Sequence, residues 1–335
     1  MCTRAIQSGT LDDPKLAMTF YNRAGAHLAK GAFSSAIQDY EQALRLKPND
    51  AMAFYNRGIA YMAMGLQARA IEDFDRTIRI KPDDANAFNN RGNAYATMGD
   101  FERAIQDYDH ALRLNRDHAD AFNNRGNARA ARGDYEGAIQ DYDQAVRLRP
   151  RDASAFYNRA GAYKAKGDIL RAIQDYDETV RLNPRSKAFY GRGAARFDAG
   201  EFIAAASDFA QAFRLDRTNS YAMLRYYVAR ARAGITDDAM LADSSRSMPP
   251  SWPRQIVDYY MGLADISAVL NAARHADQAT YRQQECEAYF FIGEKLLMEG
   301  RPDAAMGMLR RALESGAVRT PSYESAKAEL AGLAR

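Results

Sequence analysis

The stretch AFYNRGIAYMAMG, at residues 53–65, recurs with small changes along this 335-residue chain. Successive copies begin 34 residues apart, except for the last, which follows after 33. A second phrase comes after each copy, as in AIQDYDHALRLNR at residues 104–116. A constant period of this length is typical of proteins built from stacked repeats. The other copies of the first phrase begin at Thr19, Ala87, Ala121, Ala155 and Ala188.

Each repeat is predicted to form two helices. Phe88, Gly92 and Tyr95 stand at i, i+4 and i+7, which places them on one face of a helix. The second phrase has the same period; a glycine ends the first helix, and a proline usually ends the second. A small residue at position 8 lets a neighbouring helix approach closely. We expect six such repeats, at residues 17–50, 51–84, 85–118, 119–152, 153–185 and 186–219.

The residue pattern within each repeat resembles the tetratricopeptide repeat (TPR) family. It has a large apolar residue at position 4, aromatic residues at 11 and 24, alanine at 20 and 27, and proline at 32. The departures are Arg129 and Arg196 at position 11, and Arg116 and Arg217 at position 32. The resemblance implies an all-α fold, a right-handed superhelix (α-solenoid) of antiparallel helix pairs. One pair cannot bury its apolar face alone, so stacking supplies the stability.

The remaining residues are also expected to be helical. Residues 1–16 form a lead-in to the repeats, and residues 220–249 a degenerate repeat and linker with a weak helix at 237–246. Residues 250–335 form a C-terminal helical region, which contains a divergent repeat at 286–319 and a terminal capping helix.

The C-terminal phrases WPRQIVDYYMG and EAYFFIGEKLLMEG, at residues 252–262 and 287–300, resemble the end of the new lipoprotein I family. Those proteins are dimeric adaptors of the bacterial cell envelope. The resemblance implies a bacterial origin and a possible homodimer, located in the periplasm or envelope if a signal was trimmed and otherwise in the cytoplasm. The sequence leaves three states open for Cys2, which are lipidated, disulfide-bonded and free. Cys286 is expected to be buried in a repeat.

An arginine at position 7 and an aspartate at position 23 occur in all six repeats, always 16 residues apart. Bidentate Arg–carboxylate pairs suit half-buried sites, so we expect a structural ladder of ion pairs within the repeats rather than a basic groove. Removing one partner of a buried pair is expected to cost about 3–5 kcal/mol. The pairs are Arg23/Asp39, Arg57/Asp73, Arg91/Asp107, Arg125/Asp141, Arg159/Asp175 and Arg192/Asp208.

An asparagine series occupies position 6, and positions 2, 5, 6 and 9 form a helical stripe opposite the packing face. The series resembles the asparagine track of O-linked N-acetylglucosamine transferases, where such a stripe lines a concave groove and holds a peptide backbone. A carboxamide both donates and accepts hydrogen bonds, which suits that ligand. The alternative is that these amides only join neighbouring helices. The candidate peptide-binding residues are Tyr21, Asn22, Tyr55, Asn56, Asn86, Asn89, Asn90, Asn93, Asn123, Asn124, Asn127, Tyr157 and Asn158.

Other function classes have little support in the sequence. The net charge of +3 and the paired arginines argue against nucleic-acid binding. No apolar run is long enough to span a membrane, and no metal-ligand spacing or catalytic motif occurs, so we expect no cofactor, no metal and no enzymatic activity. Asp120 would repel the carboxylate that chaperone-binding repeats of this family clamp.

The predicted function is therefore that of an adaptor or scaffold, which binds an extended peptide or a partner protein along the asparagine and tyrosine stripe. The alternative is an oligomeric scaffold that assembles through residues 220–335 and has no peptide ligand.

Overall fold

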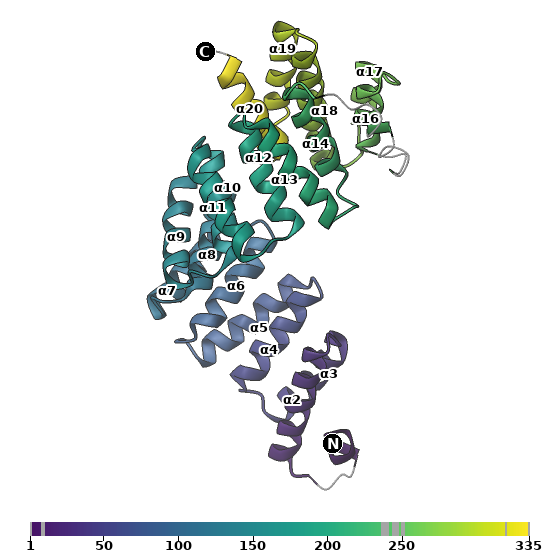
Figure 1. The fold of residues 1–335 in the computed structure, drawn as a ribbon. Coiled ribbons are helices and arrows are strands. Elements are labelled where there is room, and N and C mark those ends of the chain that lie inside the picture. Colours follow the sequence, from purple (N-terminus) through teal and green to yellow (C-terminus); the bar gives the residue numbers. More distant parts are fainter. Residues whose placement is uncertain are drawn as a thin grey trace. The chain divides into compact units, whose positions relative to one another are not determined.

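The computed structural model describes residues 2–7, 11–235, 241–242, 248, 252–318 and 320–333. Every regular element in these ranges is a helix, which confirms the predicted all-α solenoid of helix pairs (Figure 1). The chain divides into two compact units, Met1–Pro150 and Arg151–Arg335. They are called the N-terminal and the C-terminal unit below.

The N-terminal unit contains the lead-in helix and the first four repeats. In each repeat the first helix, here called the A helix, packs antiparallel against the second, the B helix, and successive A helices are neighbours. Its helices are α1 (Cys2–Gln7), α2 (Asp13–Ala29), α3 (Phe33–Leu46), α4 (Ala51–Ala63), α5 (Gln67–Ile80), α6 (Ala85–Thr97), α7 (Phe101–Leu114), α8 (Ala119–Ala131) and α9 (Tyr135–Leu148).

Glycines explain how the two helices of a repeat come so close. A Cβ added at Gly92 would stand 2.8 Å from the ring of Tyr108, and one at Gly126 would stand 2.6 Å from the ring of Tyr142. The aromatic side chain at position 24 therefore fills the space that a larger residue at position 8 would need. Gly99 ends α6 with a φ of 81°, a conformation that residues with a side chain rarely adopt.

The C-terminal unit begins with the last two repeats and continues with less regular helices. The predicted weak helix at 237–246 lies largely outside the described residues, of which only 241–242 are helical there. Its helices are α10 (Ala153–Ala165), α11 (Ile169–Leu182), α12 (Ser186–Asp198), α13 (Phe202–Leu215), α14 (Ser220–Arg232), α16 (Arg254–Tyr260), α17 (Ile266–Ala272), α18 (Gln278–Met298), α19 (Pro302–Glu314) and α20 (Pro321–Leu333).

One hydrophobic core joins the last repeats to the irregular helices of this unit. It includes Phe209 of α13, Val228 of α14, Phe291 of α18 and Leu309 of α19. Cys286 is completely buried in the same core, as predicted. The final helix, α20, does not simply cap the chain, because it packs on α12 as well as on α18 and α19.

Candidate binding surface

The predicted ion pairs form within each of the six repeats. In the second repeat, Arg57 donates through Nε and Nη2 to the two carboxylate oxygens of Asp73, at 2.8 and 2.7 Å. The guanidinium is 17% exposed and the carboxylate 4%. Burial raises the pKa of Asp73, and the hydrogen bonds from Arg57 oppose that effect. The corresponding pairs at Asp39, Asp107, Asp141, Asp175 and Asp208 are also close ion pairs.

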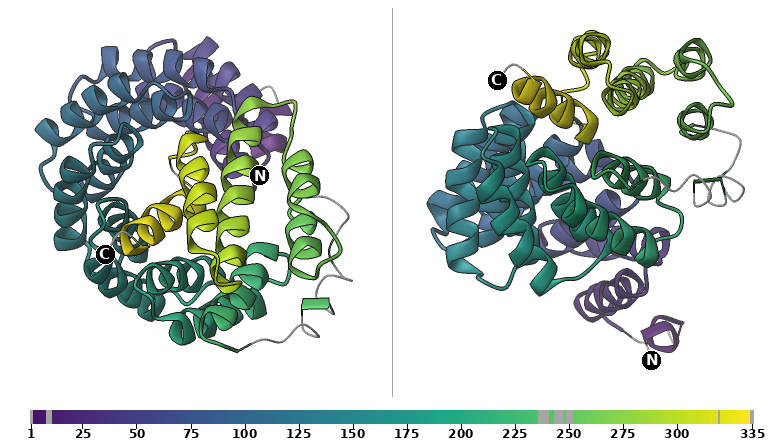
Figure 2. Two further views of the ribbon diagram at one scale, coloured as in Figure 1. Left: turned by 90° about the horizontal axis from the view of Figure 1, so that it is seen from above. Right: turned by 45° about the horizontal axis from the view of Figure 1, so that its top comes forward.

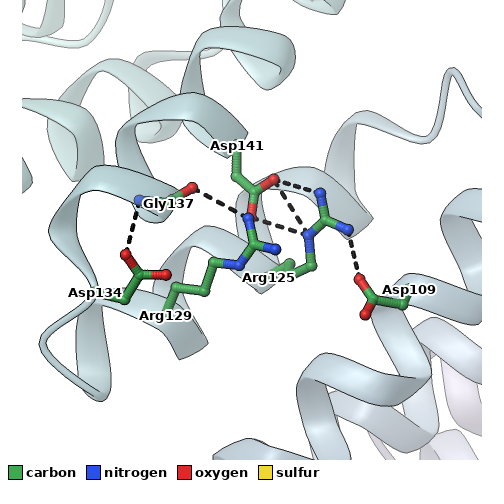
Figure 3. Close-up of polar contacts among 6 residues, drawn as sticks. All are labelled: Asp109, Arg125, Arg129, Asp134, Gly137 and Asp141. Atoms are coloured by element: carbon green, nitrogen blue, oxygen red, sulfur yellow. Dashed lines mark hydrogen bonds and ion pairs between the residues drawn. The ribbon is translucent and has the colours of Figure 1, made fainter.

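A second acidic residue, at position 25, joins the ladder to the neighbouring repeat. Arg91 uses its remaining Nη1 to reach Asp75 of the preceding repeat at 2.6 Å, and Arg192 reaches Asp177 at 2.8 Å. Figure 3 shows the same arrangement around Arg125, which lies between Asp141 of its own repeat and Asp109 of the one before. The guanidinium thus pairs within its own repeat and also fastens two repeats together.

Arginine at position 11 extends the ladder where the aromatic residue is missing. Arg129 donates to Asp141 at 3.0 Å, and Arg196 donates to Asp208 at 2.8 Å. The ladder arginines also lie over the phenylalanine at position 4, as Arg57 does over Phe54 with 5.6 Å between the guanidinium carbon and the ring centroid. These guanidiniums are held by carboxylates and by an aromatic ring, so they form a structural element.

The asparagines at position 6 connect neighbouring A helices. Asn56 donates to the hydroxyl of Tyr21 at 2.9 Å, and Asn90 donates to the hydroxyl of Tyr55 at 2.8 Å. In the fourth repeat Asn124 donates to Oδ1 of Asn89 at 3.1 Å. Part of their role is thus the alternative considered from sequence, hydrogen bonding between helices. A carboxamide has two N–H donors and two acceptor lone pairs, so one bond of this kind leaves most of its capacity.

Other members of the predicted stripe also have structural partners. Asn93 and Asn127 accept hydrogen bonds from Tyr108 and Tyr142, each at 2.8 Å, and Asn89 is only 6% exposed. Asn22, Asn86 and Asn127 are exposed, whereas Asn123 is half-buried.

His118 begins the fourth repeat as the N-cap of α8, and Asn86 is its partner. The backbone N–H of Ala121 donates to Nδ1 of His118 at 3.4 Å, so the opposite ring nitrogen carries the proton. That nitrogen, Nε2, lies 3.2 Å from Oδ1 of Asn86. Burial lowers the pKa of His118, which favours the neutral ring.

Exposed methionines lie at position 2 of the first two A helices and were not among the predicted residues of the stripe. Met18 is 61% exposed and Met52 is 46% exposed. Together with Tyr21 and Leu46 they line a cleft of about 610 Å³. In the next two repeats position 2 is polar, with Asn86 and then Asp120. The stripe therefore changes along the unit from apolar to amide-rich.

The predicted stripe has different surroundings in the C-terminal unit. Tyr157 and Asn158 are half-buried in α10. Tyr157 lines a cavity together with Tyr190 and with Thr320, Pro321 and Glu324, which belong to the start of α20 or directly precede it. This part of the stripe is thus covered by the chain itself.

Comparison with known families agrees with the geometry of the repeats. Family models described as TPR repeat or tetratricopeptide repeat match residues 24–65, 51–84, 85–118, 126–167 and 157–221. The chain is a tetratricopeptide repeat protein. Tetratricopeptide repeat proteins generally mediate protein–protein interactions. A search of curated proteins finds no significant match.

Solved structures of TPR proteins share the fold. This TPR chain is similar to PilW, a widely conserved type IV pilus biogenesis factor, with 19% identity and a TM-score of 0.58 over 62% of this chain and 97% of PilW. It is also similar to PilF of Pseudomonas aeruginosa, with 18% identity and a TM-score of 0.56 over 64% and 96% of the two chains. A tetratricopeptide repeat protein of Parabacteroides merdae aligns at 21% identity and a TM-score of 0.55, over 68% and 89%.

The resemblance to new lipoprotein I and the bacterial origin that it implies are not confirmed by the comparisons and stay predictions. Within the described ranges of this TPR protein, no helix is both long enough and apolar enough to cross a membrane.

Proposed function

We propose that this TPR protein is an adaptor whose N-terminal unit binds an extended segment of a partner protein along the A helices. The observation that carries the proposal is the stripe itself. It presents exposed Met18 and Met52 beside a cleft at one end, and exposed Asn86 at the other. The methionines offer an adaptable apolar surface, and the amides can pair with a peptide backbone.

The hydrogen bonds between A helices support this function instead of opposing it. Because Asn56 and Asn90 are each tied to a tyrosine of the preceding repeat, their carboxamides have fixed positions before a ligand arrives. A ligand then does not have to order these side chains, which lowers the cost of binding. At about 0.5–1.5 kcal/mol net per hydrogen bond, several contacts are needed, and we expect micromolar affinity.

Alanine at the asparagines is a poor test, since it also removes contacts between repeats. A better variant is Met18→Asp with Met52→Asp, because both side chains are exposed. The matched control is Leu170→Asp with Ile203→Asp, at side chains 72% and 71% exposed on B helices of the other unit. Peptides selected from a random extended library on the native chain are then titrated by fluorescence anisotropy.

The methionine variant is expected to bind the selected peptides at least about tenfold more weakly, a loss of about 1.4 kcal/mol. The control should bind them as the native chain does. Equal affinity for all three proteins would place binding elsewhere, and would favour assembly through residues 220–335 if sedimentation also shows a dimer.

A further inference from the structure

The last helix of the chain occupies the surface of the C-terminal unit that corresponds to the stripe. Figure 2 shows α20 in yellow beside the teal helices of the same unit. Lys327 of α20 donates to the carbonyl of Ala165 at the end of α10, at 3.4 Å. Ser325 and Glu329 face two arginines of α14, at 3.2 and 3.1 Å. Polar contacts thus tie α20 to two A helices, α10 and α14.

The fully buried side chains of α20 are small and mostly polar. Ala326 is the one hydrophobic residue among its fully buried side chains, which otherwise are serines. Cavities of about 240 and 200 Å³ flank the helix, the first between Lys164 and Ala328, the second beside Pro321. Tyr323, Leu330 and Leu333 of α20 are half-buried against the core, so release of the helix exposes part of their apolar surface. The incomplete packing beside the two cavities lowers that cost, which is a feature of a contact that can exchange.

The surface beneath α20 has more basic groups, Lys164, Arg225 and Arg232, than acidic ones, which are the buried carboxyl groups of Asp198 and Glu294. Arg232 pairs with Glu329 of α20 and with the buried Glu294 of α18. Arg225 takes the place that asparagine has at position 6 of earlier repeats, and it is only 2% exposed. Its guanidinium lies over the ring of Phe290, at 4.9 Å from the centroid.

Arg225 is poorly satisfied by α20. Its Nη1 donates to the hydroxyl of Ser325, while Nε and Nη2 have no hydrogen-bond partner in the part of the chain that the structure describes. No carboxylate of the described residues forms an ion pair with it. A buried guanidinium is stabilised best by a carboxylate, so a serine at this point leaves most of its binding capacity unused.

We propose that the face formed by α10, α12 and α14 is a second binding surface, which takes an acidic helical segment of a partner protein, and that α20 covers it as an exchangeable occupant. The partner helix has small residues on its buried side, a carboxylate where α20 has Glu329, and a carboxylate where α20 has Ser325. The second carboxylate would pair with Arg225 and give the partner an advantage over α20. This surface is separate from the stripe of the N-terminal unit and does not depend on it.

Two substitutions in the full chain are expected to release α20, one by adding positive charge and the other by adding negative charge. Glu329→Lys repels Arg232, and Lys327→Glu repels the carbonyl end of α10. The first raises the net charge by two and the second lowers it by two, so a shared effect cannot come from net charge. Lys327 is exposed, which protects the fold of that variant. Glu314→Lys, at an exposed residue of α19, is the matched control.

Hydrogen exchange first reports whether α20 is released. Amides of residues 321–333 are expected to exchange at least about tenfold faster in both variants than in the native chain and the control, with unchanged helical circular dichroism. If the Glu329→Lys variant loses helicity, the exchange rates of the Lys327→Glu variant decide whether α20 is exchangeable. Native exchange rates in both variants would overturn the claim that α20 is exchangeable.

Fluorescein-labelled peptides then probe the uncovered face. They have the sequence of residues 320–333, either unchanged, with Asp in place of Ser325, or with Gln in place of both Glu324 and Glu329. The unchanged peptide should bind the two variants at least about tenfold more tightly than the native chain. The Asp peptide should bind tighter still, and the Gln peptide more weakly.

Release of α20 without binding of any peptide would overturn the proposal. Equal affinity for the Ser and Asp peptides would overturn the role of Arg225 in selecting a carboxylate.

Discussion

The same helix positions have different roles in the two units. Position 6 of the A helix is Asn56, Asn90 and Asn124 in the N-terminal unit, where each amide joins the preceding repeat and is half-buried. In α14 of the C-terminal unit the same position is Arg225, which is buried beneath α20. The repeat pattern therefore determines how helices stack, whereas the residues on the outer face determine what covers them.

The largest effect is expected from breaking the ladder of the N-terminal unit at Asp141. This carboxylate accepts from both Arg125 and Arg129 and is 3% exposed (Figure 3). Asp141→Ala leaves both guanidiniums without their main acceptor, and should lower the free energy of unfolding by about 3–5 kcal/mol. Urea denaturation measures the loss, and amide exchange should locate it in α8 and α9.

The matched control for Asp141→Ala is Asp83→Ala, at an exposed turn residue, with an expected change within about 0.5 kcal/mol. Similar losses for the two variants would show that the ladder adds nothing beyond ordinary surface charge.

Opposite pH dependence of the two units is the second prediction. Burial raises the pKa of Glu294 to about 8, so the folded C-terminal unit favours the protonated carboxyl. The contribution of Glu294 to the free energy of unfolding is fully present below the ordinary carboxyl pKa. It is lost as the pH rises towards 8, by up to about 1.4 kcal/mol per pH unit. The pKa of His118 is lowered, so its contribution is present above about 6.5 and is lost as pH falls.

Exchange protection factors measured from pH 5 to pH 9 test this contrast. Protection in α18 should fall as the pH rises from 5 to about 8, and protection in α8 should fall as the pH drops below about 6.5. Glu294→Gln and His118→Asn remove the titrating groups, and asparagine still serves as an N-cap. If both units lost protection in the same direction, the assignment of these two groups would be wrong.

A smaller effect is expected from methyl groups added at two glycines. Gly126→Ala should lower stability by about 1–3 kcal/mol, because its Cβ would overlap the ring of Tyr142. Gly161→Ala should raise it by about 0.5–1 kcal/mol, since the nearest atom there, the hydroxyl of Tyr176, is 4.0 Å away. Thermal unfolding compares the two. Loss of stability at both would mean that the space beside Gly161 is closed.

Most of the fold was predictable because its determinants are local and repeated. The close approach at Gly92 and the turn at Gly99 follow from residue size and backbone freedom. The pairing of Arg91 with Asp107 was found because its spacing is the same in every repeat. The hydrogen bond from Arg91 to Asp75 also spans 16 residues, but towards the N-terminus. The acidic residue at position 25 of the preceding repeat is the sequence feature that could have predicted it.

The contacts of α20 were not predictable in this way. Arg225 and Ser325 are 100 residues apart, and neither belongs to a pattern that the rest of the chain repeats. Helical periodicity indicated that residues 322–333 form a helix, but it contains no information about which distant surface that helix covers. The exposure of Met18 likewise depends on tertiary packing, since methionine is common in cores.

The double attachment of Arg91, Arg125 and Arg192 has a consequence for how such a chain can change length. Arg91, Arg125 and Arg192 each donate to an aspartate of the copy before, so a copy of this kind can be duplicated or deleted by recombination and the new junction still closes. The sixth repeat has Ala210 at position 25, and α14 has Tyr226 at position 7. These two residues end the series, so the ladder offers no such junction between the sixth repeat and α14.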